Sequence, residues 1–155
     1  MELLLAYDRL NDVAALIKEY TKELLAHGDD VKQCLHTQNL EHEIENLQQT
    51  YALPYGRLYL ALSGGEIAGC AGLTRTNDAY CEMKRFYIRP AFRGRHFSNL
   101  IIQHLIQDAR QIGYQFIRLD TFPFLDTAIK LYQKYGFFPI ERYNNNPAKR
   151  RFLCS

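Results

Sequence analysis

The apolar residues in the front of the chain are spaced first as a strand and then as two helices. Residues 3–7 form a short apolar run that predicts a first strand. Between about residues 10 and 26, apolar side chains recur every three or four positions, which is typical of an amphipathic helix. A second helix is predicted over about residues 38–49, and Pro54 and Gly56 follow it as breakers.

Three strands are predicted next. The runs 57–62 and 66–73 are rich in apolar residues, and residues 63–65 (Ser-Gly-Gly) between them are a hairpin signal. A turn at residues 77–78 (Asn-Asp) then returns a third strand, residues 80–88, antiparallel to the second. Together these segments predict an antiparallel meander.

The middle of the chain changes from strand spacing to helix spacing. After strand 80–88, Pro90 ends the ladder because proline has no N–H to donate. Apolar residues then recur with helical spacing at Leu100, Ile101, Ile102, Leu105, Ile106 and Ala109. Gly113 ends this helix, and a buried strand over residues 116–121 follows. A strand–helix–strand crossover of this kind makes its two strands parallel.

The last segments complete a mixed sheet. A helix is predicted over residues 126–135, and strands over residues 137–140 and 151–153. We therefore expect one α/β domain over residues 1–155, with helices on both sides of a mixed central sheet. The N-terminal part of that sheet is an antiparallel meander, and its middle is a parallel βαβ crossover.

Composition narrows the class of protein. Apolar residues make up 47% of 155 residues and the net charge is +2, so no basic excess argues for nucleic acid. No apolar run approaches the roughly 20 residues that span a bilayer, and the N-terminus is not typical of a signal peptide. We expect a cytoplasmic protein without membrane or nucleic-acid partners. The four cysteines lack metal-type spacing, which indicates free thiols and no metal site.

The junction after strand 80–88 has the features of a phosphate site. A basic, glycine-containing loop, residues 93–98 (Arg-Gly-Arg-His-Phe-Ser), joins the strand to the next helix. The first turn of a helix has N–H groups without intrahelical partners, and the helix dipole adds positive charge there. The sequence therefore predicts that this junction binds phosphate.

Four segments together resemble the GNAT superfamily of N-acetyltransferases. They are residues 82–90 (EMKRFYIRP), Arg93-Gly94, residues 119–121 (LDT) and Ala128-x-x-Leu131-Tyr132-x-x-x-Gly136-Phe137. They stand in the family's order and at its spacings over nearly the whole chain, which is more specific than one short motif. The resemblance implies the GNAT fold and an acetyl-CoA-dependent N-acetyltransferase, which is an acyltransferase enzyme.

The resemblance also implies acetyl-CoA as the cosubstrate. The family's loop pattern, Gln/Arg-x-x-Gly-x-Gly/Ala, maps to residues 93–98, with His96 at a glycine position and Ser98 at a Gly/Ala position. Both residues keep the backbone N–H groups through which the loop acts, and histidine accepts the left-handed region better than most residues. We expect binding to survive, at full or reduced strength. The implied cofactor-binding residues are Phe86, Tyr87, Ile88, Arg93, Gly94, Arg95, His96, Phe97, Ser98 and Asn99.

In the family, two parallel strands splay apart beside the cofactor. The resemblance assigns this role to strand 80–88 and strand 116–121, the crossover pair. The pantetheine arm would then hydrogen-bond to backbone near Phe86 and Ile88, because ladder groups are free where the strands separate.

Acetyl transfer needs one group that takes a proton from the amine and another that protonates the leaving thiolate. Tyr132 stands at the family's general-acid position, and a phenol is protonated at neutral pH; the alternative is a core tyrosine on an amphipathic helix. Glu82 is the candidate base, since some family members carry a catalytic glutamate there. The alternative for Glu82 is an ion pair with Lys84 or Arg85.

Strand alternation gives further expectations for these side chains. Glu82, Lys84, Phe86 and Ile88 should share one face of the sheet, with Arg85 on the other. Lys84 or Arg85 could bind a substrate carboxylate, and an ion pair within the fold is the alternative.

Two departures concern the end of strand 116–121 and the helix after it. Asp120, which ends that strand, belongs to the segment that matches the family, and a structural role rather than a catalytic one is expected for it. The family often places asparagine where this chain has Leu125, so one polar contact to the cofactor is expected to be absent.

The acceptor is the least determined part. The reaction expected is attack by a small primary amine, amino acid or polyamine-like, in a ternary complex, because no cysteine stands beside an activating base. Acetylation of a peptide or protein and a non-catalytic acyl-CoA-binding module are the alternatives, and a homodimer is left open. The candidates to line the acceptor pocket are Tyr20, Tyr51, Tyr55, Tyr80 and Tyr143, with packing in the core as the alternative expected for most of them.

Overall fold

A seven-stranded sheet organises the protein in the computed structural model, which describes residues 1–28, 31–32, 39–140 and 150–154. The strands are β1 (Glu2–Leu5), β2 (Arg57–Ser63), β3 (Glu66–Arg75), β4 (Tyr80–Ile88), β5 (Phe116–Thr121), β6 (Phe138–Ile140) and β7 (Arg150–Cys154). The helices are α1 (Leu10–Leu25), α3 (Leu40–Glu45), α4 (Leu47–Thr50), α5 (Phe97–Ile112) and α6 (Asp126–Lys134), with a 3₁₀ turn at Pro90–Phe92.

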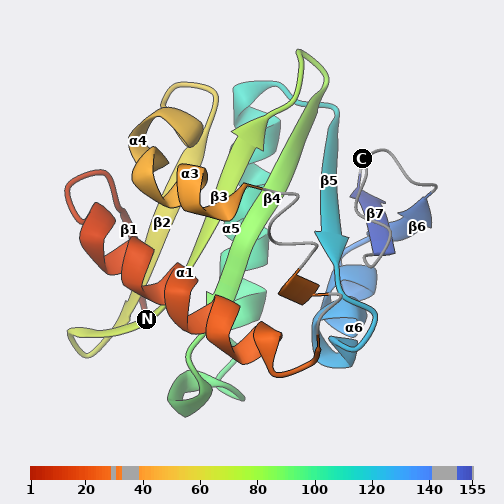
Figure 1. Cartoon of the computed structure of the whole chain (residues 1–155). Coiled ribbons are helices and arrows are strands. Elements are labelled where there is room, and N and C mark those ends of the chain that lie inside the picture. Colours follow the sequence, from red (N-terminus) through yellow and green to blue (C-terminus); the bar gives the residue numbers. More distant parts are fainter. Residues whose placement is uncertain (29–30, 33–38, 141–149, 155) are drawn as a thin grey trace.

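The sheet order is β1-β2-β3-β4-β5-β7-β6 (Figure 1). Strands β1 to β4 are antiparallel neighbours, and β4 and β5 are parallel, with α5 as the crossover between them. Strand β7 then pairs antiparallel with β5 on one side and with β6 on the other. The predicted α/β domain with an antiparallel front and a parallel crossover in the middle is confirmed.

Helices cover both faces of the sheet (Figure 1). One apolar core joins the sheet to α5 and α6, with Ile101, Ile102 and Leu105 fully buried in it. The other joins the sheet to α1, α3 and α4, and Leu16 and Ile17 of α1 lie at its centre. The apolar faces of the amphipathic helices therefore pack against the sheet in two separate cores, one on each side of the strands.

The predicted helix over residues 38–49 is two short helices in the described part of the chain. Asn46 separates α3 from α4 with φ −127° and ψ 36°, outside the helical region. Its side-chain amide donates to the His42 carbonyl oxygen at 2.9 Å, so it competes with the helical ladder. Residue 38, at the start of the predicted helix, lies outside the described residues.

Candidate active site

Strand β4, beside which the cofactor site is predicted, contains a β-bulge. In the ladder between β3 and β4, Cys70 pairs with Tyr87 and Gly72 pairs with Lys84. One residue of β3 lies between these two pairs, whereas two residues of β4 do. One extra residue therefore lies in β4, and Arg85 within it has a left-handed backbone with φ of 56°. Beyond the extra residue, each β4 side chain therefore points to the face of the sheet opposite to the one that regular alternation would give it.

The prediction that Glu82, Lys84, Phe86 and Ile88 share one face is therefore wrong. Phe86 and Ile88 pack in the core beside α5 and α6. The Lys84 ammonium lies on the other side, 3.1 Å from a carboxylate oxygen of Glu43 on α3. Period-two alternation fails because the bulge adds a residue to one strand only.

Lys84 and Arg85 also do not lie on opposite faces, because both reach Glu43. The Arg85 guanidinium holds the Glu43 carboxylate in a bidentate pair at 2.7 and 2.9 Å. An ion pair within the fold is the alternative that the structure shows for both basic side chains. Glu43 stands 42 positions before Arg85, and no sequence signal singled it out.

Strands β4 and β5 pair over a short stretch and then diverge. The paired residues are Tyr80 with Phe116, Cys81 with Ile117 and Glu82 with Arg118. From Met83 onward the β5-facing backbone groups of β4 have no ladder partner in β5. The splay expected from the family resemblance is present, and it lies beside the bulge.

A cleft of about 680 Å³ opens beside the diverging strands. Of the ten residues assigned to the cofactor, those that line this cleft are Phe86, Tyr87, Ile88, Arg93, Gly94, His96, Phe97, Ser98 and Asn99. Arg95 is not among the described residues that line it. Its guanidinium instead lies over the Phe92 ring, 5.5 Å from the ring centroid.

The loop before α5 adopts the backbone geometry that the family pattern assigns to glycine. Gly94 has φ of 79°, and His96, directly before α5, has φ of 63°. Arg93 donates to the Ile88 carbonyl oxygen at 3.0 Å and to Glu23 at 2.9 Å, so it ties the loop to β4 and α1. The first turn of α5 therefore presents its N–H groups at one end of the cleft.

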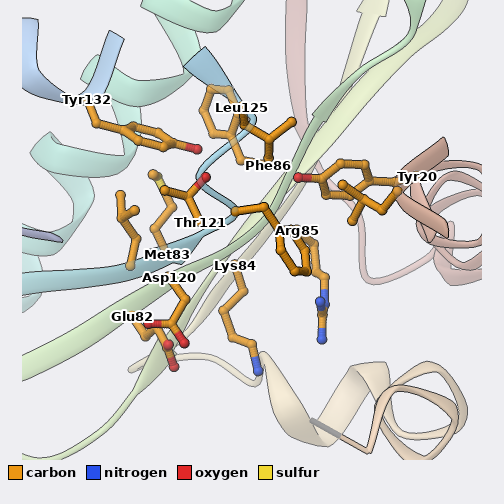
Figure 2. Close-up of a pocket in the computed structure, with 13 residues that line it drawn as sticks. Tyr20, Glu82, Met83, Lys84, Arg85, Phe86, Asp120, Thr121, Leu125 and Tyr132 are labelled. Carbon is orange, nitrogen blue, oxygen red and sulfur yellow. The ribbon is translucent and has the colours of Figure 1, made fainter. Parts of the chain in front are cut away.

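Tyr132 lies in α6 at the far end of this cleft, with its hydroxyl directed toward the space beside Phe86 (Figure 2). Its ring packs edge-on against Phe86, 6.2 Å between centroids, and beside Phe137 at 5.8 Å. Burial raises the pKa of Tyr132 far above its usual value, and the neighbouring Tyr20 adds to the rise. The phenol is therefore protonated at neutral pH and can donate.

A second, smaller pocket of about 50 Å³ adjoins the cleft and contains Glu82. Asp120 at the end of β5 lines it too, so each of the diverging strands contributes one carboxylate to this pocket (Figure 2). Tyr132 lines both spaces. The structure thus brings the candidate acid and the candidate base to one connected region.

Tyr20 is the predicted acceptor-pocket tyrosine that lines this region. Its ring stacks on Tyr87 at 4.9 Å, and burial above all raises its pKa to about 12. Tyr51, Tyr55 and Tyr80 do not line either pocket. Tyr143 lies outside the described residues.

The other tyrosines are used in packing. The Tyr51 hydroxyl donates to Glu43 at 2.9 Å, and its ring is fully buried. Tyr55 lies beneath the Arg75 guanidinium, and Tyr80 stacks on Phe116. Leu125, where the family often has asparagine, lines both pockets with an apolar side chain.

The part of the chain that the structure describes contains neither a candidate metal site nor a membrane-spanning helix. No group of three His, Cys, Asp or Glu side chains there could hold a metal ion. None of the helices in the same residues is long and apolar enough to cross a bilayer. Cys70 and Cys81 are buried free thiols, and burial raises the pKa of each to about 12.

Known proteins resemble this chain in sequence and in fold. An uncharacterised N-acetyltransferase of Schizosaccharomyces pombe is 34% identical over 140 residues, covering 89% of this chain and 82% of the relative. An IAA acetyltransferase of Azospirillum brasilense is 32% identical over 90 residues, covering 57% and 59%. An N-acetyltransferase of Thermoplasma acidophilum, solved with coenzyme A, has a TM-score of 0.72 at 15% identity and covers 99% of both chains.

The sequence profile of the acetyltransferase (GNAT) family matches residues 16–137, which include α1 from Leu16 onward, the diverging strands, the loop before α5 and Tyr132. That segment is most of the chain, and it contains the cleft and its neighbouring pocket. The protein is an acyltransferase enzyme that uses acetyl-CoA, and it belongs to the GNAT family of N-acetyltransferases.

Proposed function

We propose that the protein transfers an acetyl group from acetyl-CoA to the primary amine of a small molecule, amino acid or polyamine-like, in a ternary complex. The observation that supports this most is the shared wall between the two spaces. Tyr20, Phe86, Leu125 and Tyr132 line both the large cleft and the small pocket. A thioester in the cleft and an amine in the pocket would therefore meet without a covalent enzyme intermediate.

Acetyl-CoA would lie along the second part of β4. Its pyrophosphate would bind the N–H groups at the start of α5, and its pantetheine arm would bind backbone groups that β5 leaves unpaired. Arg93 would act indirectly, because its guanidinium already binds Ile88 and Glu23. The thioester would then lie near Phe86 and Tyr132, which line the cleft.

In the proposed reaction, the amine nitrogen attacks the thioester carbonyl carbon, and the carbon–sulfur bond breaks. The Tyr132 hydroxyl protonates the departing thiolate. The proton released by the attacking amine passes to Glu82, directly or through one water molecule, because Glu82 lines the small pocket in which the amine would bind. Each proton thus has a named donor and acceptor.

The small pocket favours a small acceptor. Its volume of about 50 Å³ fits an amine-bearing end group. Glu82 and Asp120 contribute carboxylates that attract a cationic amine, and Tyr20, Phe86 and Tyr132 contribute aromatic rings that can contact it. The relative named for IAA is likewise an acetyltransferase of a small molecule.

A thiol-release assay with a panel of amines tests the proposal. Acetyl-CoA is incubated with amino acids, polyamines and a peptide with a free N-terminus, and free CoA thiol is measured against a reaction without acceptor. We expect release with at least one small amine and none with the peptide. Release with the peptide alone would overturn the small-molecule acceptor. Acetyl-CoA binding measured by calorimetry in the same preparation shows that an inactive sample still binds its cosubstrate.

A further inference from the structure

We propose that Glu43 is a positioning residue for acetyl-CoA, which acts by holding the β4 bulge in the shape that opens the cofactor cleft. Glu43 does not line the cleft itself. It lies on α3, and its carboxylate binds Arg85 and Lys84, which line the smaller pocket beside the cleft. The inference rests on the placement of acetyl-CoA proposed above.

The bulge needs a residue in a conformation that arginine rarely adopts. Arg85 has φ of 56°, where a Cβ crowds the neighbouring carbonyl oxygen. Glycine accepts this region freely, but the chain has arginine here. A non-glycine residue stays in such a conformation only when its surroundings hold it there.

Contacts with the Arg85 side chain provide that restraint. Its Nε and Nη2 donate to the two oxygens of Glu43 at 2.7 and 2.9 Å, and its side chain is only 7% exposed. Charge-assisted bidentate pairs of this kind fix direction as well as distance. The Cys70 thiol also donates to the Arg85 carbonyl oxygen at 3.3 Å, which restrains the backbone itself.

Glu43 is in turn held in place by a second set of contacts. The Tyr51 hydroxyl and the Lys84 ammonium bind its carboxylate at 2.9 and 3.1 Å. Burial alone would raise the pKa of Glu43, but hydrogen bonds and charges from Arg85 and Lys84 lower it to about 2. The Tyr51 ring packs where Gly72 has no side chain, since a Cβ there would lie 2.5 Å from it. The carboxylate is therefore charged and fixed.

The position of the bulge connects this network to the cofactor. It lies beyond Lys84, shortly after Glu82, the last β4 residue paired with β5, and it turns Phe86 and Ile88 to the face of the sheet that α5 and α6 cover. A β4 strand without the bulge would direct these two side chains to the opposite face. Loss of Glu43 is therefore expected to weaken acetyl-CoA binding without removing any group that touches the ligand.

Two substitutions of Arg85 separate backbone shape from ion pairing. Arg85→Gly and Arg85→Ala both delete the ion pair, but only glycine keeps easy access to a positive φ. We expect Arg85→Gly to bind acetyl-CoA within about twofold of the unmodified protein, and Arg85→Ala to bind about tenfold more weakly. Calorimetry is done below the unfolding transition of every variant, and circular dichroism checks that each is folded.

Glu43→Gln completes the test. Alone, it is expected to raise the dissociation constant of acetyl-CoA about tenfold, because neutral glutamine holds Arg85 more weakly. Added to Arg85→Gly, it is expected to change that constant less than about twofold, since the bulge no longer depends on it. Glu45→Gln, an exposed position on the same helix, is the matched control.

Three results would overturn the inference. One is equal affinity of the Arg85→Gly and Arg85→Ala variants. Another is unchanged affinity in a folded Glu43→Gln protein, which would leave Glu43 with a stabilising role only. The last is a full tenfold loss when Glu43→Gln is added to Arg85→Gly. Because the ligand is acetyl-CoA without acceptor, these outcomes do not depend on the amine or on Tyr132. Absence of binding by the unmodified protein would instead contradict the proposed cofactor site.

Discussion

The two parts of β4 carry out different tasks with similar residues. The first part, Tyr80–Glu82, is paired with β3 on one side and β5 on the other. The second part, after the bulge at Arg85, keeps β3 but loses β5 and faces the cleft instead. Regular pairing satisfies backbone groups within the sheet, whereas interrupted pairing leaves them for a ligand. A strand can thus be structural at one end and a binding surface at the other.

The largest expected effect is a fall in kcat on substitution of Tyr132, which lines the cleft beside the second part of β4. Tyr132→Phe removes the proposed proton donor and keeps the ring that packs on Phe86, so kcat should fall about a thousandfold with acetyl-CoA affinity unchanged. Tyr80→Phe, in the paired part, keeps its stack on Phe116 and should leave kcat unchanged. Steady-state kinetics and calorimetry check both. A Tyr132→Phe enzyme with full kcat would remove the acid role.

The next effect concerns the network that holds the two parts at their junction. The pKa of Glu43 falls from 4.5 in the unfolded chain to about 2, which corresponds to about 3 kcal/mol of stability. A carboxyl whose pKa is lowered on folding stabilises the protein above pH 4.5, and this contribution is lost as the pH falls toward 2. Urea unfolding from pH 7 to pH 2.5 should show that loss.

The variants Glu43→Gln and Glu45→Gln test this assignment. Glu43→Gln should be less stable at pH 7 by about 3 kcal/mol, and its stability should depend less on pH between 5 and 2.5. Glu45→Gln, exposed on the same helix, should follow the unmodified protein. Identical pH dependence of the two variants would contradict the role of the buried pair.

Glu82 lies at the boundary, as the last β4 residue paired with β5. Glu82→Gln keeps the shape of the side chain but removes the proposed proton acceptor, so kcat should fall about a hundredfold. Acetyl-CoA affinity should not change, because Glu82 is not among the residues that line the large cleft. Glu66→Gln, exposed at the start of β3, is the control. An unchanged kcat and pH–rate profile for Glu82→Gln would assign proton removal to another group.

The smallest effect is expected in the loop that continues the diverging part. His96→Gly removes a side chain from a backbone with φ of 63°, so stability should rise by about 1 kcal/mol without loss of acetyl-CoA affinity. Ser98→Gly, the other departure from the family pattern, places glycine inside the first turn of α5 and should lower stability by a similar amount. Thermal unfolding should show a higher melting temperature for His96→Gly and a lower one for Ser98→Gly. A fall in stability for His96→Gly would show that its side chain contributes a favourable contact.

Sequence reasoning located elements and motifs well because these depend on local patterns. The succession of strands and the parallel crossover were predicted from these patterns, and the splay beside the crossover was predicted from the family resemblance. The helix predicted over residues 38–49 is instead two short helices. The bulge was not predicted, because β-bulges of this kind carry no required residue type and Arg85 gives no sign of a positive φ. The face assigned to Phe86 and Ile88 was wrong for that one reason.

Contacts between distant segments were the other limit. Glu43 and Arg85 are 42 residues apart, and nothing in either segment indicates the pair. Tyr51 and Tyr80 illustrate the same difficulty, since residue type suggested an aromatic pocket and the structure uses both in packing. Tyr20 lines both pockets, although its stack on Tyr87 could not be foreseen.

The wall shared by the two pockets has a practical consequence for inhibitor chemistry. A single molecule in which the CoA sulfur is joined through a short acyl spacer to an amine would occupy both spaces across Tyr20, Phe86 and Tyr132. Its two halves would be tethered at close range, so affinity gained by one half adds to that of the other. Such bisubstrate compounds, made with different amines, could rank candidate acceptors by binding alone.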